Sequence, residues 1–107
     1  MILSTTETIA GKRVTKTLGL VRGNSVRARN IGRDIMALMR NVVGGEVPEY
    51  TKLIAEAREQ ALDRLVEQAE ELGADAVVCV RFQTTEMMET AAELLAYGTA
   101  VLLEDSQ

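Results

Sequence analysis

The chain contains no histidine and no tryptophan, a single cysteine, and only three aromatic residues among 107. Without histidine, it lacks the commonest general base and the commonest ligand for zinc and copper. Catalytic triads of the serine–histidine or cysteine–histidine type are therefore excluded. A zinc or copper site within one chain would have to depend mainly on carboxylates, which match the preferences of these metals poorly. These absences make an enzyme the less favoured class of protein.

Phosphate-binding loops and membrane signals are also missing. Gly11-Lys12-Arg13 is similar to the end of a P-loop, but Arg13 stands where serine or threonine is needed and Thr6 where glycine is needed. The first residues form neither a basic region nor a long apolar run, and no later run approaches the ~18 apolar residues of a membrane span. The sequence therefore predicts a cytoplasmic protein without a membrane partner.

Hydrophobic residues make up 47% of the chain, which suits one domain over residues 1–107. Its core must be built mainly from aliphatic side chains and methionine, because aromatic residues are scarce. Domains this small leave a large part of their surface exposed. Burial of an apolar face against a second copy would add stability, so we expect a homo-oligomer.

In the first half of the chain, the pattern of apolar and turn-forming residues predicts two extended segments followed by a helix. A short strand is expected over 1–5 and an extended segment over 13–26, in which Gly19 and Gly23 indicate a bulge or bend. Asn30 is a good N-cap for a helix that ends at Gly44-Gly45, where a positive φ is easily adopted.

The second half of the chain predicts a long helix followed by a hairpin. The helix runs over 48–72, from Pro48 to a stop at Gly73. A strand over 76–82 follows, then a turn near 88–91 and an antiparallel strand over 94–103, in which Gly98 indicates close packing or a bulge. Helical spacing places one buried face at positions 50, 53, 54, 57, 61, 65, 69 and 72. Acidic residues fall largely on the other side, at positions 56, 59, 63, 67 and 70.

The stretch from Asn30 to Tyr50 is the first candidate site, because polar groups stand beside the apolar stripe 31, 35, 38, 39 and 42. Its candidate ligand or interface residues are Asn30, Arg33, Asp34, Gly44, Gly45 and Tyr50. Arg33 and Asp34 could hold a small anion or transfer a proton, but such a pair more often fixes a helix end or an interface. We favour a junction that caps two helices and joins subunits, with ligand binding as the alternative.

Charge is unevenly distributed along the chain. Residues 12–40 hold eight bases and one acid, whereas residues 46–107 hold fourteen acids and four bases. The favoured interpretation is that the basic segments neutralise the acidic helix within a subunit or across an interface. The alternative is an anion-binding face made of Arg22, Arg27, Arg29 and Arg33. Nucleic acid fits poorly, because the basic segment has no aromatic residue for base stacking and the net charge is −4.

Two features bear on metal binding. Cys79 lies within an apolar run and cannot form an internal disulfide, so we expect a small buried core residue. Glu59, Asp63 and Glu67 recur on one helix face and could gather a hard cation. Because such sites usually combine loop carbonyls with convergent carboxylates, a solvated helix surface is the favoured interpretation.

Together, these residues resemble the YbjQ-like family of small bacterial and archaeal proteins, which are often labelled heavy-metal-binding. The resemblance covers nearly the whole chain. It rests on Ser4-Thr5-Thr6, Gly11, Gly19, Val21, Gly23, Asn30-Ile31, Arg33-Asp34, Val43-Gly44-Gly45, Tyr50, Ala57-Arg58, Ala61, Leu72-Gly73-Ala74-Asp75-Ala76-Val77 and Gly98-Thr99-Ala100-Val101. It implies an α+β, dodecin-like subunit with two helices and a small antiparallel sheet, assembled into a ring-shaped homo-oligomer, with a pentamer expected. It implies no established activity.

The chain departs from that family at two places. Glu46-Val47-Pro48 stands where relatives commonly have Arg-Ser, which removes an anion contact there. Cys79 stands where many relatives have glycine or another small residue. The leading hypothesis is a non-enzymatic oligomeric binding or scaffolding protein. The alternatives are a metal-binding protein that uses Cys79 and carboxylates across subunits, and an enzyme or binder of a small anion that uses Arg33 and Asp34.

Overall fold

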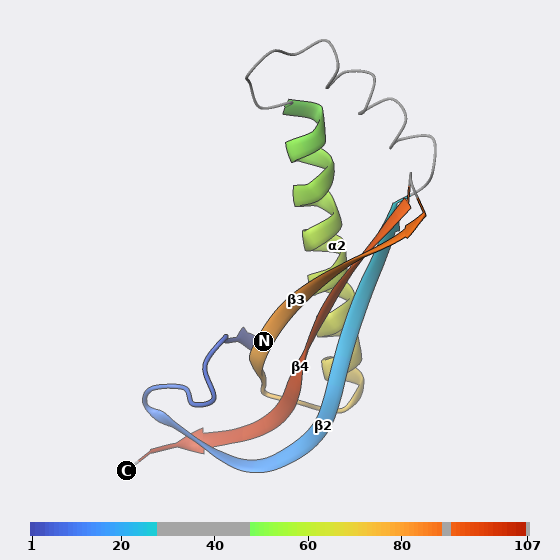
Figure 1. Ribbon diagram of the computed structural model, residues 1–107. Helices are drawn as coiled ribbons and strands as arrows, with labels where there is room; N and C mark the ends of the chain where they lie inside the picture. Colours follow the sequence, from blue (N-terminus) through green and yellow to red (C-terminus); the bar gives the residue numbers. More distant parts are fainter. Residues whose placement is uncertain (28–47, 89–90, 107) are drawn as a thin grey trace.

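The computed structural model describes residues 1–27, 48–88 and 91–106, and the side chains of 1–25, 54–85 and 93–106. This part of the chain forms one four-stranded sheet and one long helix (Figure 1). The elements are β1 (Ile2–Leu3), β2 (Lys12–Arg27), α2 (Pro48–Glu71), β3 (Ala76–Met88) and β4 (Ala91–Asp105). The α+β class is therefore confirmed. The helix predicted between Asn30 and Gly44 lies outside the described residues.

The strands are arranged in the order β1-β3-β4-β2. The β3–β4 hairpin and the β2–β4 pair are antiparallel, as predicted for the hairpin. The sheet is not wholly antiparallel, however, because Ile2 and Leu3 pair in parallel with Ala76 and Val77. Since β2 and α2 lie between these two strands in the sequence, the connection is long enough for parallel pairing. The expectation of a purely antiparallel sheet was wrong at this edge.

Strands β3 and β4 both extend beyond their predicted ends. The predicted strand over 76–82 continues to Met88, and the predicted strand over 94–103 begins at Ala91 and ends at Asp105. Gln83, Thr84 and Thr85 are exposed and lack the apolar alternation that indicates a strand from sequence. Their pairing with β4 holds them in the sheet.

The helix α2 starts at Pro48 as predicted and stops one residue before the predicted end. Gly73, with φ of 75°, closes it. The Gly73 N–H donates to the Glu70 carbonyl at 2.9 Å, and the Ala74 N–H donates to the Ala69 carbonyl at 3.1 Å. This pair of bonds is a Schellman cap, which satisfies carbonyls that the helix leaves free at its end.

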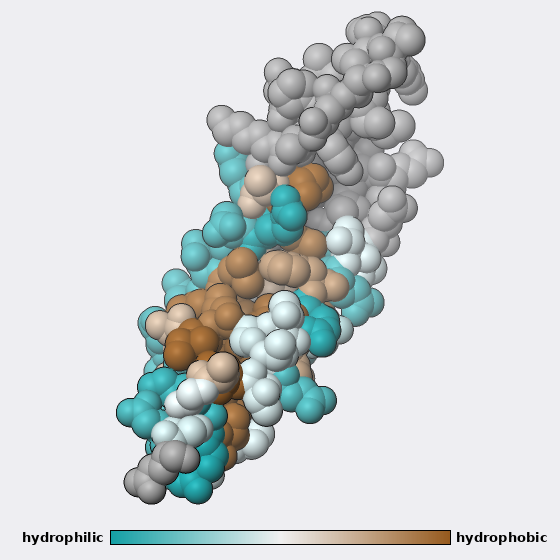
Figure 2. Space-filling model, turned by 90° about the vertical axis from the view of Figure 1, so that its left-hand side faces the viewer, coloured by the Kyte–Doolittle hydropathy of each residue, from teal (hydrophilic) through white to brown (hydrophobic). Residues whose placement is uncertain are grey.

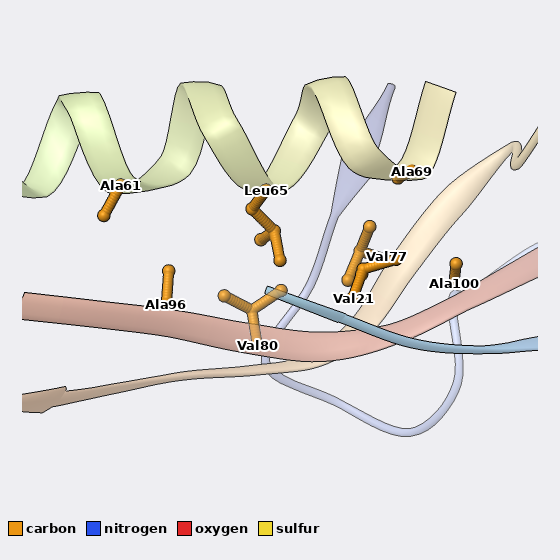
Figure 3. Close-up of a cluster of buried hydrophobic side chains, with 8 residues drawn as sticks. All are labelled: Val21, Ala61, Leu65, Ala69, Val77, Val80, Ala96 and Ala100. Atoms are coloured by element: carbon orange, nitrogen blue, oxygen red, sulfur yellow. The ribbon is translucent and has the colours of Figure 1, made fainter. Parts of the chain in front are cut away.

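The main core lies between α2 and one face of the sheet, hereafter the covered face (Figure 3). In Figure 3 the helix contributes Ala61, Leu65 and Ala69, whose side chains point toward the strands. The full cluster comprises Val21, Ala61, Leu65, Ala69, Val77, Val80, Ala96 and Ala100. Its many small side chains allow the helix to lie close to the strands. The buried positions 57, 61, 65 and 69 confirm the predicted helix face, but Ile54 and Leu72 at its two ends are exposed.

Two glycines lie where neighbouring atoms come too close to leave room for a Cβ atom. A Cβ atom at Gly23 would lie 2.2 Å from the Ala61 carbonyl oxygen and 2.4 Å from the Leu65 nitrogen. Gly23 is therefore a contact point for α2. Of the bulge or bend predicted there, the bulge was wrong, because no register shift occurs at that position. The bulge prediction was right for Gly19, where the β2–β4 register shifts. At Gly98, a Cβ atom would lie 2.7 Å from Val77 Cγ1, which confirms the predicted close packing.

The subunit is long and thin. Its principal extents are 58 × 24 × 16 Å, and its radius of gyration is 17.3 Å, against about 13 Å for a compact chain of this length. A second, smaller cluster lies on the opposite face of the sheet, hereafter the far face. It consists of Ala76, Val78 and Val101, with Ile9, Cys79 and Leu103 packed against it. The N-terminal segment thus covers one end of the far face.

Candidate functional site

Most of the predicted site lies beyond what the structure describes. Asn30, Arg33, Asp34, Gly44 and Gly45 are outside the described residues. The backbone of Tyr50 lies in the first turn of α2, as expected, but its side chain is outside them. Ligand or interface roles for these six residues therefore stay predictions.

Cys79 is in a different position from the one expected. Its φ is 56°, and it lies where the β3–β4 register shifts between Val78 and Arg81. The side chain is half-buried rather than fully buried. The Cys79 N–H donates to the Thr6 carbonyl at 3.1 Å, and Sγ lies 3.8 Å from the same oxygen. The bulge turns the thiol toward the N-terminal segment, away from the main core.

A hollow of about 430 Å³ lies beside this thiol on the far face. Glu7, Lys12, Thr17 and Thr99 contribute polar groups, and Val78 and Val101 contribute apolar ones. Within the described ranges, no group of three or more cysteine, aspartate and glutamate side chains is arranged to hold a metal ion.

Ion pairs link the basic and acidic parts of the sequence. Lys12 Nζ lies 2.5 Å from Asp105 Oδ1, and Arg13 Nη2 lies 2.9 Å from Glu104 Oε1. The hydrogen bond from Lys12, together with its positive charge, lowers the pKa of Asp105 below its ordinary value of 3.8. Both pairs join β2 to β4. The expectation that the basic segment neutralises the acidic helix is thus wrong for Lys12 and Arg13, because the register places them opposite the acidic end of β4.

The acidic row on α2 faces solvent as predicted. Glu56, Glu59, Asp63, Glu67 and Glu70 are all exposed. At 100° per residue they fall within an arc of about 80°, centred opposite the buried positions 57, 61, 65 and 69. We call these five residues the acidic stripe. No ion pair in the described part of the chain involves them.

The uncovered part of the far face brings together residues from three strands. Tyr97 of β4 lies directly opposite Arg22 of β2 and Arg81 of β3. The neighbouring residue Ala96 packs against α2, so alternation along β4 places Tyr97 on the far face. Leu20 and Leu95 lie in the adjacent rows of the same face. We call the set Leu20, Arg22, Arg81, Leu95 and Tyr97 the platform.

The platform combines exposed or half-buried apolar side chains with charged ones. Leu20 is 68% exposed, the highest value among the exposed large hydrophobic residues of the described chain, and Leu95 and Tyr97 are half-buried. The Arg81 guanidinium donates to the carbonyls of Thr5 at 2.8 Å and Val80 at 2.9 Å. Tyrosine and arginine are both enriched in protein interfaces. Sequence reasoning singled out Arg22 but missed the platform, because its members meet only through strand register.

Contacts from α2 hold the adjoining edge of β2. Gln68 Oε1 accepts from the Arg22 N–H at 2.6 Å, and the Arg64 guanidinium donates to the Asn24 carbonyl. Side chains of the helix thus form hydrogen bonds with backbone groups of β2 that an open sheet edge would leave exposed. Searched over its described residues, the structure has no helix that is long and apolar enough to span a membrane.

This architecture, one helix packed on a four-stranded mixed sheet, defines a small α+β domain. It is similar to the crystal structure of a protein of unknown function from Pediococcus pentosaceus, assigned to the DUF74 family, with a TM-score of 0.64 and 16% identity over 97% of this chain and 98% of the other. At that identity the likeness concerns the fold alone.

The family is shown by the sequence. Residues 1–104 match the model of the YbjQ family, described as "putative heavy-metal-binding", and the chain belongs to this family. A UPF0145 protein of Methanosarcina acetivorans is 60% identical over 94% of this chain and 95% of its own length. A UPF0145 protein of Halorubrum lacusprofundi is 61% identical over 96% of this chain and 99% of its own length. The resemblance seen in the sequence is thereby confirmed.

Proposed function

We propose that this protein is the subunit of a non-enzymatic homo-oligomer that acts as a binding or scaffolding particle. The observation that carries the proposal is the thin, extended shape of the subunit, whose radius of gyration of 17.3 Å exceeds the roughly 13 Å of a compact chain. A shape of this kind exposes much apolar surface, and association with further copies would bury it.

Exposed hydrophobic side chains support the same proposal. Large apolar residues are exposed at the N-terminus, on β2 and β3, and on and just after α2. They are Met1, Ile2, Leu3, Val14, Leu20, Ile54, Leu72 and Phe82. Figure 2 shows hydrophobic side chains gathered on the side of the molecule that carries the N-terminus in Figure 1. Extended exposed apolar surface is typical of proteins that bind partners.

Light scattering coupled to size exclusion tests this proposal. The subunit mass is 11.7 kDa, and we expect a single species of several subunits at micromolar concentration, with five the number that the family resemblance favours. A monomer under these conditions would remove the proposal.

A second candidate is metal binding shared between subunits. It is supported by the family description, by the half-buried thiol of Cys79, and by Glu7, which lines the same hollow. An oligomer would multiply these donors, and a thiolate is a good ligand for soft metals. Calorimetry with Cd(II) at neutral pH should show weaker binding for Cys79→Ser than for the parent, whereas the control Glu71→Gln, an exposed carboxylate away from the hollow, should be unchanged. Equal binding by Cys79→Ser would end this candidate.

A further inference from the structure

We propose that the platform of one subunit docks on the acidic stripe of α2 in a second copy of the chain. The inference rests on the proposed homo-oligomer and goes further, since it names the two surfaces that meet. The platform is Leu20, Arg22, Arg81, Leu95 and Tyr97, and the stripe is Glu56, Glu59, Asp63, Glu67 and Glu70.

The platform has the composition of an interface centre. Leu20 and Leu95 provide apolar area in rows on either side of Tyr97, and Tyr97 itself stands opposite an arginine on each neighbouring strand. Asn24 and Gln83 continue the Leu95 row with polar side chains. An apolar centre bordered by charged and polar groups is the usual anatomy of a protein interface.

The platform is also positively charged. Arg22 makes no ion pair within the described residues, and Arg81 bonds to two backbone carbonyls, which do not neutralise it. The row Arg22–Tyr97–Arg81 therefore presents two positive charges on one line across the sheet. A partner with an extended negative surface would complement it.

The same chain carries such a surface. The acidic stripe is exposed along α2, and no basic residue between 56 and 70 shares its arc, since Arg58 lies on the side of the buried positions and Arg64 on a flank of the helix. A second copy thus supplies the complementary charge without any other partner.

Charge also decides how two copies are related. A two-fold contact of platform with platform would bring arginines against arginines, and a two-fold contact of helix with helix would bring carboxylates together. Of these three arrangements, platform against stripe is the one that pairs opposite charges, and it uses a different surface on each subunit. Such a head-to-tail contact closes into a ring when its rotation allows closure.

A charge-reversal experiment tests the docking. In Arg22→Glu the backbone N–H of residue 22 can still donate to Gln68, so the fold is retained while the platform loses its positive charge. We expect this variant and Asp63→Arg each to raise the subunit dissociation constant at least tenfold, measured by mass photometry at low salt. The double variant should recover most of the loss. Lys16→Glu is the matched control, because it makes the same charge change on β2 opposite Leu102, outside the platform.

The outcomes separate the two proposals. A monomeric parent would contradict the homo-oligomer itself. An oligomeric parent that Arg22→Glu leaves intact, or that shows no recovery in the double variant, would overturn the docking alone. Because arginines beside a tyrosine can also bind bases, single-stranded polyuridylate is titrated in parallel. An oligomer unaffected by Arg22→Glu, together with RNA binding abolished by it, would replace the second copy with nucleic acid.

Discussion

The two faces of the sheet use the same strands for different purposes. On the covered face, Val21, Gly23 and Ala96 are fully or almost fully buried against α2. On the far face, the adjacent residues Leu20, Arg22 and Tyr97 are exposed or half-buried. Because neighbouring residues of a strand point to opposite faces, one short sequence stabilises the fold and at the same time presents a surface to a partner. Substitutions should therefore divide cleanly between effects on folding and effects on assembly.

The largest difference between the faces is expected for leucine truncations. Leu65 is fully buried in the main core, so Leu65→Ala should lower the free energy of unfolding by about 3 kcal/mol. Leu20 is 68% exposed in the subunit, so Leu20→Ala should change it by less than about 0.5 kcal/mol when the subunits are dissociated. Urea unfolding followed by circular dichroism at low protein concentration measures both. Equal losses for the two variants would contradict the distinction.

The second-largest effect on stability is expected where β2 lies against α2 on the covered face. Gly23→Ala places a methyl group against backbone atoms of α2, so we expect a loss of about 2 kcal/mol in the free energy of unfolding. Gly11→Ala is the control, because Gly11 has φ of 80° but no atom within 4 Å of an added Cβ. That variant should lose about 1 kcal/mol from backbone strain alone. A Gly23→Ala protein as stable as Gly11→Ala would show that the helix can move away.

A hydrogen bond beneath α2 should contribute less. Ser25 is fully buried, and its hydroxyl donates to Gln60 Oε1 at 2.8 Å. Gln60→Ala removes that acceptor and should cost about 1 kcal/mol. Thermal unfolding of the double-mutant cycle with Ser25→Ala measures the coupling, which should be positive. Strict additivity of the two substitutions would mean that the bond does not stabilise the fold.

The smallest effect concerns the exposed pair Lys12–Asp105. The pair lowers the pKa of Asp105 in the folded state, so its contribution is complete above the ordinary pKa of 3.8 and is lost as pH falls through the lower folded value. The stability of the parent should therefore fall slightly more steeply than that of Asp105→Asn in acid titrations. Added salt should reduce the difference, because the pair is exposed. Identical acid profiles at low salt would contradict this contribution.

Much of the fold was predictable from local patterns. The stop at Gly73 and the buried positions 57, 61, 65 and 69 follow from helix caps and helical spacing. The parallel β1–β3 pair was not predictable, because its partners lie far apart in the sequence. The polar end of β3 also gives no periodic signal and is held by pairing with β4.

The candidate site was less predictable than the fold. Arg22, Tyr97 and Arg81 belong to three strands, and their row exists only because of the register on both sides of β4. The alignment of Arg81 with Tyr97 depends on the β3–β4 register shift beside Cys79. The apolar run around Cys79 contains no sequence signal that predicts this shift. By contrast, the acidic stripe could be identified from spacing alone, since every member lies on one helix.

Cysteine trapping tests directly whether the platform of one subunit contacts the acidic stripe of another. In a Cys79→Ser background, the double substitution Leu20→Cys with Asp63→Cys places one thiol on the platform and one on the acidic stripe. We predict that mild oxidation gives a ladder of disulfide-linked chains on a non-reducing gel, while either single substitution stays uncrosslinked. A protein that is oligomeric but gives no ladder, or a dimer formed as readily by Leu20→Cys alone, would contradict the head-to-tail contact between the two faces.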